Sequence, residues 1–188
     1  MAQADKKKWD AKYTGREGSG QHDPWLDTIA HLLPDKGAAL DVAGGAGRNA
    51  LWMARRGLRV TLTDISTVGM EIALGQASRE GLSLSLLAAD LDSDPLSEGP
   101  WDIVMCLNFL DRRLFGDFKR LLAPGGVLVF AQPTLSNLQR HKHPSERYLL
   151  QDGELPELVQ GLDIRLYEEG WADSGRYEAR VVARKGED

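Results

Sequence analysis

Short apolar runs alternate with amphipathic segments between residues 38 and 131, and this alternation constrains the fold more than any other feature of the chain. The runs at 38–43 and 101–107 are apolar almost throughout, which is typical of strands covered on both faces. The intervening segments repeat their apolar residues every three or four positions, as helices do. Strands are predicted at 38–43, 58–62, 82–89, 101–107 and 127–131, and helices at 46–56, 66–79 and 111–122.

Strands that are joined through helices of this length form a parallel sheet with right-handed crossovers, so we expect an α/β, Rossmann-like, doubly wound fold. The last part of the chain differs. A helical piece at 152–159 precedes two strand-like runs, 164–169 and 177–183, with the turn sequence Ala-Asp-Ser-Gly at 172–175 between them. This pattern predicts a C-terminal antiparallel hairpin at one edge of a mixed seven-stranded sheet.

The first 37 residues are polar and are interrupted by glycine and proline, with one amphipathic piece at 25–33. Because 188 residues correspond to about one domain, we expect a single globular protein. Its parts are an N-terminal helical segment at 1–37 and the main domain at 38–188. The sequence leaves the oligomeric state open.

The composition excludes several classes of protein. Lys plus Arg number 23 and Asp plus Glu 28, and the net charge of −5 argues against a nucleic-acid binder, although it leaves room for a local basic patch. Cys106 is the only cysteine, so no internal disulfide forms, and its place in a predicted strand suggests a buried thiol. No apolar run approaches the ~18 residues that span a bilayer. The chain also lacks a secretory leader, so we expect a cytoplasmic protein without membrane contact.

A glycine-rich segment from Asp41 to Asn49, DVAGGAGRN, lies between the first predicted strand and the first predicted helix. Small residues let a ligand approach the backbone, and a helix N-terminus offers free N–H groups. Ligands of open parallel sheets bind beyond the carboxyl ends of the strands, where this segment lies. The same residues fit the G-x-G-x-x-G/A pattern of dinucleotide sites, and a tight turn without a ligand is the plain structural alternative.

Acidic residues follow each of the first three predicted strands. Asp64 lies about 20 residues after the first glycines of the glycine-rich segment, the spacing at which an acid in dinucleotide sites binds the ribose hydroxyls. It could instead only cap the next helix. Asp90, with Leu91 beside it, could accept a hydrogen bond from the amine of adenine, or could be an ordinary loop acid. Asp41 distinguishes between the possible cofactors, because a carboxylate at this position repels the pyrophosphate of a dinucleotide and favours a ligand with an ammonium or a sulfonium. A nicotinamide-dependent oxidoreductase is therefore the first rival interpretation.

These residues resemble the class I S-adenosylmethionine-dependent methyltransferases, and within them the small tellurite-resistance and thiopurine methyltransferase-like branch. The resemblance is carried by residues 9–13, 40–49, 63–66, 90–91, 101–104 and 122–126. It implies an enzyme that uses S-adenosyl-L-methionine and methylates a small molecule, such as a thiol or a chalcogen oxyanion. One departure is Ala43, which stands where the family usually has its first glycine. Alanine is tolerated there if its φ is negative, and its carbonyl can still accept from the cofactor ammonium.

The resemblance assigns roles by position. The cofactor-binding positions are Asp41, Ala43, Gly45, Gly47, Asp64, Ile65, Asp90, Leu91 and Leu107. The acids among them would take the roles given above, Ile65 and Leu91 would pack on adenine, and the Leu107 backbone would meet the methionine moiety. The N-terminal segment of this branch folds over the cofactor, which makes Trp9, Tyr13 and Arg16 candidate lid residues. A helix face packed on the core explains Trp9 and Tyr13 equally well.

Methyl transfer from a sulfonium is an in-line displacement that depends on positioning, so we name no catalytic residue. Arg112, Arg147 and Arg176 are candidates for binding an anionic acceptor, with solvated surface arginines as the alternative. The segment at 107–110 lacks the Asn/Asp-Pro-Pro-aromatic pattern of amino-methylating enzymes. Methylation of RNA or protein, and a non-catalytic scaffold, stay open. His141 and His143 lack a third ligand, so no metal is expected.

Overall fold

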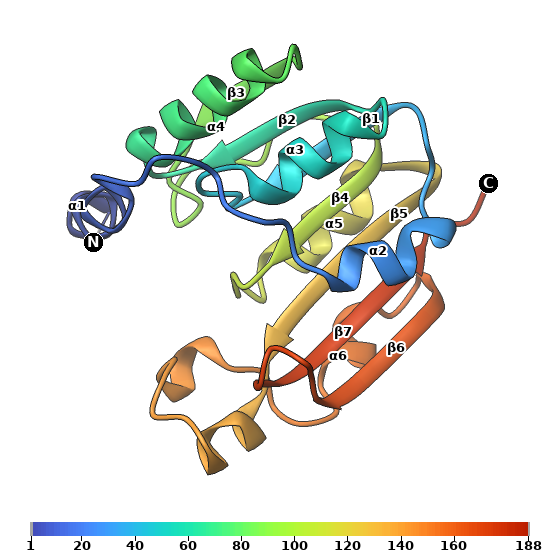
Figure 1. Cartoon of the computed structure of the whole chain (residues 1–188). Coiled ribbons are helices and arrows are strands. Elements are labelled where there is room, and N and C mark those ends of the chain that lie inside the picture. The colour runs from blue at the N-terminus through green and yellow to red at the C-terminus, as the bar shows by residue number, and fades with distance from the viewer. Residues whose placement is uncertain (1, 188) are drawn as a thin grey trace. The chain divides into compact units, whose positions relative to one another are not determined.

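The structure of the chain, a computed structural model, describes residues 2–187, and its strands follow the predicted order (Figure 1). Seven strands form one mixed sheet in the order β3-β2-β1-β4-β5-β7-β6, which confirms the predicted α/β, Rossmann-like fold. By its internal contacts the chain divides into two compact units, residues 1–101 and 102–188, which are described in turn. The predicted division at residue 37 stays a prediction.

The first unit holds the parallel part of the sheet. Its elements are α1 (Ala2–Tyr13), α2 (Trp25–Ile29), η1 (Ala30–Leu32), β1 (Ala38–Val42), α3 (Arg48–Arg55), β2 (Arg59–Asp64), α4 (Thr67–Arg79) and β3 (Leu84–Ala88). β1 pairs in parallel with β2, and β2 pairs in parallel with β3. The carboxyl ends of these strands therefore meet at one edge, where Asp41 and Asp64 lie.

Local sequence explains where these elements begin. Ser66 precedes α4 as predicted, and its side chain accepts a hydrogen bond from the Gly69 N–H at 3.1 Å, which satisfies one of the free donors of the helix. The amphipathic piece at 25–33 buries one face through Trp25, Ile29 and Leu33. It is split into α2 and η1 rather than continuous.

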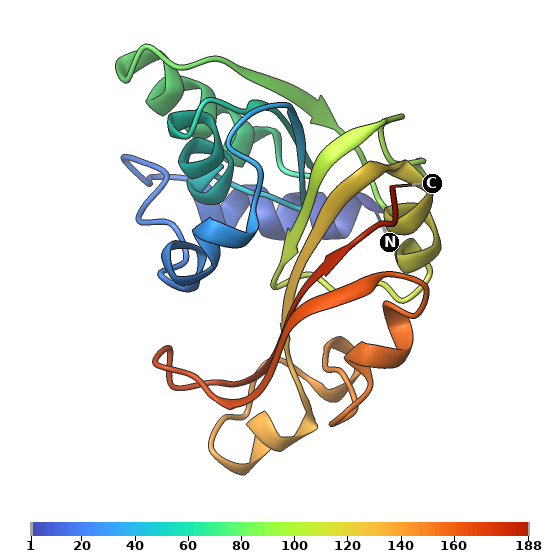
Figure 2. The same ribbon diagram turned by 90° about the vertical axis from the view of Figure 1, so that its right-hand side faces the viewer.

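The second unit contains β4 (Trp101–Leu107, which begins at the last residue of the first unit), the antiparallel strands and the short helices between them. Its other elements are α5 (Leu114–Leu121), β5 (Leu122–Pro133), η2 (Leu135–Gln139), η3 (Glu146–Tyr148), α6 (Leu155–Leu158), β6 (Asp163–Trp171) and β7 (Tyr177–Arg184). β7 pairs antiparallel with both β5 and β6, so the predicted C-terminal hairpin is present (Figure 2). Cys106 is buried in β4, as expected.

One predicted boundary is wrong. The strand predicted at 127–131 starts earlier, because β5 begins at Leu122 and includes the Pro-Gly-Gly sequence at 124–126. The reason is long-range pairing with the chain beyond β7. The Gly125 N–H donates to the Lys185 carbonyl at 3.1 Å, and the Lys185 N–H donates to the Gly126 carbonyl at 2.9 Å.

Within the described residues, no helix combines the length and the apolar character that a membrane span requires.

Candidate functional site

The Asp41 side chain lies beneath the loop at 43–47, at the carboxyl end of β1. It is 1% exposed, and its Oδ2 has no hydrogen-bond partner among the described residues. Burial, followed by the charge of Asp64, raises the pKa of Asp41 to about 7. The Ala50 N–H and the charge of Arg48 stabilise the ionised carboxylate only in part. A buried carboxylate oxygen without a partner is costly, so this position favours a ligand that brings positive charge.

Asp64 fastens the loop from the end of β2. Its Oδ2 accepts a hydrogen bond from the Gly45 N–H at 2.8 Å, and its Oδ1 accepts one from the Ser66 N–H at 2.7 Å. Burial raises the pKa of Asp64, while these N–H groups lower it. Each carboxylate oxygen has room for a further hydrogen bond, so the carboxylate that braces the loop can also bind hydroxyl groups.

The loop itself needs glycine at particular positions. Gly45 and Gly47 have φ values of 58° and 76°, in the left-handed region that favours glycine. A Cβ on Gly44 would lie 2.5 Å from the Asp41 Oδ2, and a Cβ on Gly47 would lie 2.5 Å from the Ala73 Cβ. The loop backbone is therefore packed directly on the Asp41 carboxylate.

The condition of a negative φ at Ala43 is not met. Its φ is 54°, so an alanine occupies the left-handed conformation that favours glycine. Left-handed backbone costs a residue with a Cβ about 1–2 kcal/mol. Such strain is characteristic of functional sites, where the surrounding structure maintains it.

The helix α1 is fastened to the start of α4 through Asp10. The Asp10 Oδ1 accepts a hydrogen bond from the Ser66 Oγ at 2.7 Å, and its Oδ2 forms an ion pair with the Lys6 Nζ at 2.7 Å. Lys6 also donates to the Thr67 Oγ1 at 2.8 Å. These contacts lower the pKa of Asp10, with the Lys6 hydrogen bond as the largest cause. Sequence reasoning did not single out Asp10, although it lies within the segment 9–13.

The Tyr13 side chain lies on the glycine loop. A Cβ on Gly45 would come within 2.0 Å of the Tyr13 Oη, so only glycine leaves space for this ring. The centres of the Trp9 and Tyr13 rings lie 6.4 Å apart, and the Arg16 guanidinium lies 5.3 Å from the centre of the Tyr13 ring. The structure thus brings the three candidate lid residues together beside the loop, and burial raises the pKa of Tyr13.

The segment that follows α1 is fastened to α3. The Asp23 N–H donates to the buried Asn49 Oδ1 at 3.0 Å, and the Trp52 Nε1 donates to the Asp27 Oδ1 at 2.9 Å. Asn49 belongs to the glycine-rich segment and lies in the first turn of α3, and its side chain binds the backbone of the N-terminal segment.

The third acidic position is organised differently from the first two. Asp90 is half-buried, and its carboxylate accepts from the Asp92 N–H at 3.2 Å and from the Ser93 Oγ at 3.4 Å. These are contacts within its own turn, as the loop-acid interpretation expects, and they leave its predicted role toward adenine untested. Leu91 is buried and Ile65 is half-buried.

The remaining predicted positions lie in the second unit. Leu107 ends β4 and is 8% exposed. Arg112 forms a bidentate ion pair with Glu154, at 2.5 and 2.7 Å. Arg176 donates to the Asn108 Oδ1 at 2.7 Å and also pairs with the buried Glu178. Internal partners therefore hold Arg112 and Arg176, and Arg147 also has one, since its Nη2 donates to the Tyr148 Oη.

Arg147, the third of these arginines, is exposed, and its guanidinium lies 4.4 Å from the centre of the Tyr148 ring. The roles of Arg112, Arg147 and Arg176 toward an acceptor stay predictions.

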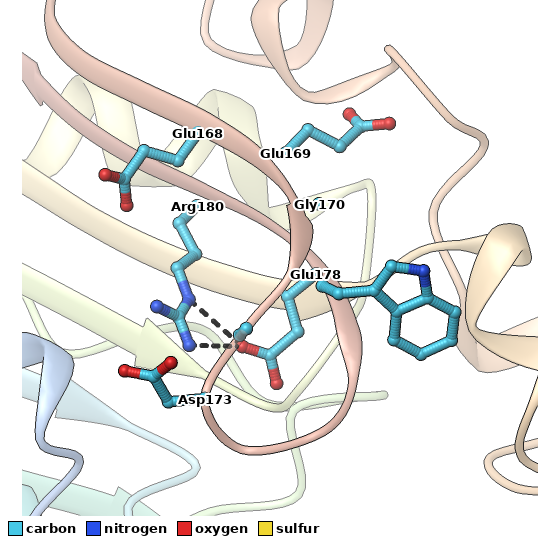
Figure 3. A pocket seen from close by; sticks show the side chains of 8 residues that line it. Glu168, Glu169, Gly170, Asp173, Glu178 and Arg180 are labelled. Atoms are coloured by element: carbon cyan, nitrogen blue, oxygen red, sulfur yellow. Dashed lines mark hydrogen bonds and ion pairs between the residues drawn. The ribbon is translucent and has the colours of Figure 1, made fainter.

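A cavity of about 290 Å³ opens at the β6–β7 hairpin (Figure 3). It is lined by Glu168, Glu169, Gly170, Trp171, Ala172, Asp173, Glu178 and Arg180. Arg180 donates to the Glu178 Oε2 through Nε at 3.0 Å and through Nη2 at 2.8 Å, as the dashed lines in Figure 3 show. Sequence reasoning missed this cavity, because its lining comes from two strands and a turn that look like an ordinary edge hairpin.

Comparison with known proteins relates the chain to methyltransferases. A family model described as a methyltransferase domain matches residues 39–126. A demethylmenaquinone methyltransferase of Thermus thermophilus is 36% identical over 97 residues, which are 48% of this chain and 44% of that protein. The chain spans less than half the length of the first curated relatives that it matches.

Solved structures share the fold. A SAM-dependent methyltransferase from Aquifex aeolicus superposes with a TM-score of 0.67 at 18% identity, covering 93% of this chain and 97% of that one. TehB from Haemophilus influenzae superposes with a TM-score of 0.71 at 21% identity, covering 87% of this chain and 62% of that one. The specific branch of the family stays a prediction.

Proposed function

Since residues 39–126 place the chain among the class I S-adenosylmethionine-dependent methyltransferases, we propose that it transfers the methyl group of S-adenosyl-L-methionine to a small-molecule acceptor. The observation that carries this proposal is the buried Asp41 carboxylate, whose Oδ2 lacks a partner directly beneath a glycine loop. The relationship to a demethylmenaquinone methyltransferase supports a small molecule as the acceptor.

The residues at the loop fit this cofactor better than they fit a dinucleotide. A ligand ammonium beside Asp41 would neutralise a charge that the protein leaves unpaired, whereas a pyrophosphate would add negative charge beside it. Asp64 would bind the ribose hydroxyls with the lone pairs that Gly45 and Ser66 leave free. The close packing of Gly44 on Asp41 leaves no Cβ between the backbone and the ligand.

The other predicted positions complete the proposed site. The Ala43 carbonyl, Gly45 and Gly47 would surround the methionine end, while Ile65, Asp90 and Leu91 would surround the adenine. Leu107 lies in the second unit, and the role of its backbone stays a prediction. When bound, the cofactor supplies a sulfonium methyl group that is activated for in-line displacement. The chain supplies position and exclusion of water, which can together lower the barrier by about 7–11 kcal/mol.

We propose that α1 is the cover of this site. Tyr13 already lies on Gly45, and Asp10 holds α1 on Ser66, two residues beyond Asp64. Trp9, Tyr13 and Arg16 would then line the entrance for the cofactor. The acceptor class is open to an anionic small molecule, for which Arg147 is the candidate whose side chain is exposed.

Calorimetric titration with S-adenosylhomocysteine, S-adenosylmethionine and NAD tests the cofactor assignment. We expect both S-adenosyl compounds to bind and NAD not to bind. Asp64→Ala should weaken binding at least tenfold, because it removes both the ribose acceptor and the brace of the loop. The matched control is Asp35→Ala, which removes an exposed acid of the same unit and should leave binding unchanged.

A release assay for S-adenosylhomocysteine, run over thiols, selenite, tellurite, phenols and amines, tests the activity. Turnover with one acceptor class, lost in Asp41→Asn, supports the proposal. Tight binding of NAD, or binding of the S-adenosyl compounds without transfer to any acceptor including RNA and protein, would overturn it in favour of an oxidoreductase or a scaffold.

A further inference from the structure

The segment at 138–148, LQRHKHPSERY, carries a local excess of basic side chains on an acidic protein. Within it Arg140, Lys142, His143 and Arg147 are exposed, and Glu146 is the one acidic residue. This segment, called here the 138–148 loop, connects η2 to η3 beside the tip of the β6–β7 hairpin in both ribbon views (Figures 1 and 2).

Hydrogen bonds to the neighbouring chain hold the loop in place. Asn137 is fully buried, and it uses both ends of its amide. Its Nδ2 donates to the His143 carbonyl at 3.2 Å, while its Oδ1 accepts from the Tyr177 N–H at 3.1 Å. The His141 Nε2 donates to the Gly175 carbonyl at 2.7 Å. These hydrogen bonds fix a basic loop onto the start of β7 and the turn that precedes it.

Aromatic rings orient two of the arginines. The Arg140 guanidinium lies 3.8 Å from the centre of the Trp171 ring, and the Arg147 guanidinium lies 4.4 Å from the centre of the Tyr148 ring. A planar guanidinium that lies on a ring keeps its N–H donors at its edge, and its outer face can receive another flat group. Both features are the ones by which proteins bind phosphates and unpaired bases together.

From this arrangement we propose that the 138–148 loop, with Trp171 behind it, is a binding surface for a single-stranded RNA segment. Phosphates pair with Arg140, Lys142 and Arg147, and a base stacks on the outer face of the Arg140 guanidinium. The cavity at the hairpin is lined by none of these cations, so they suit an extended polyanion more than one small anion in a pocket.

This surface is independent of the proposed cofactor site, and it does not make RNA the methyl acceptor. It agrees with the net charge of −5, because three phosphate contacts require only a local patch. Binding is accordingly expected to be weak and dependent on salt. For three contacts on a single strand, the logarithm of the association constant should fall with a slope of about −2 against the logarithm of the salt concentration.

The test is fluorescence anisotropy of a labelled 20-nucleotide oligouridine with the full chain and no cofactor. Between 50 and 200 mM salt, we expect the dissociation constant to rise about 20-fold. In Arg140→Ala/Lys142→Ala the slope should drop to about −0.7, with at least a tenfold loss of affinity at 50 mM salt. The matched control is Lys36→Ala/Arg165→Ala, which removes the same two charges from exposed sites elsewhere. Thermal melting checks that both variants fold.

Arg140→Lys separates stacking from charge. It should keep the salt slope but lose the preference for oligouridine over inorganic polyphosphate of equal charge, because lysine has no plane on which a base can stack. Three results would overturn the proposal: equal losses in the loop variant and its control, equal affinity of the wild type for oligouridine and polyphosphate, or binding to phosphatidylglycerol vesicles without binding to oligouridine. Since no cofactor is present, none of these results bears on the proposed methyl transfer.

Discussion

Binding of the cofactor is expected to remove a proton from Asp41. In the free protein the pKa of this carboxyl is about 7, so near neutral pH about half of the molecules carry the proton. A ligand ammonium held by Asp41 requires the ionised form. The association constant should therefore be about tenfold smaller at pH 6 than at pH 8, a difference of about 1.4 kcal/mol.

The assay is calorimetry with S-adenosylhomocysteine at pH 7, in phosphate and in Tris, whose ionisation enthalpies differ. The slope of the observed binding enthalpy against the buffer enthalpy gives the number of protons exchanged. We expect release of about half a proton per site at pH 7, rising toward one at pH 6 and falling toward zero at pH 8. Dissociation constants at the three pH values provide an independent measure of the same linkage.

Asp41→Asn is the decisive control, since the amide keeps the shape of the side chain and cannot titrate. Its affinity should be low and nearly constant from pH 6 to 8, with no dependence of enthalpy on the buffer. The pH dependence of folding stability provides a second check on the direction of the pKa shift of Asp41. Because the folded-state pKa is raised, wild-type stability should decline from pH 4 to 7 relative to Asp41→Asn. Equal proton release in both proteins would assign the proton to another group, such as Asp64, and would refute the reasoning.

Four further outcomes follow from the loop, from α4 and from α1. Ala43→Gly should raise the free energy of unfolding by about 1 kcal/mol in urea denaturation, because it relieves a φ of 54°, and a loss of stability would contradict the strain. Gly47→Ala should lower it by about 2 kcal/mol or more, since its Cβ would meet Ala73 at 2.5 Å. Gly75→Ala, in α4 and without a neighbour within 4 Å, should be neutral or stabilising. Asp10→Asn should release α1 and increase tryptic cleavage in the lysine-rich helix severalfold, and unchanged digestion would show that other contacts hold it.

Sequence periodicity was sufficient for the fold because the strands and helices are local patterns. The strand at 101–107 and the helix that begins after Ser66 were predicted nearly to the residue. The start of β5 was not, since a Pro-Gly-Gly sequence reads locally as a turn. Only its pairing with Lys185, some 60 positions later, keeps it in the sheet.

In the candidate site, too, features set by local sequence could be predicted, whereas features set by contacts between distant residues could not. Asp41 and Asp64 were found because they end strands, and strand ends are visible in the sequence. Their hydrogen bonds were not visible, and neither was the left-handed Ala43, because backbone conformation depends on the packing around the loop. Asp10 went unnoticed for a similar reason, since its partner Ser66 lies 56 residues away. The cation–ring contact of Arg140 with Trp171 likewise joins segments that the sequence separates.

Ser66 donates hydrogen bonds to two aspartates: its backbone N–H donates to Asp64, and its hydroxyl donates to Asp10. A displacement of the Asp64 carboxylate should therefore also displace α1, which Asp10 anchors to Ser66. Trp9 sits one residue before that anchor, and its indole lies 4.2 Å from the Lys12 ammonium. Ligand binding at Asp64 is therefore expected to shift the fluorescence emission of Trp9, without any attached dye.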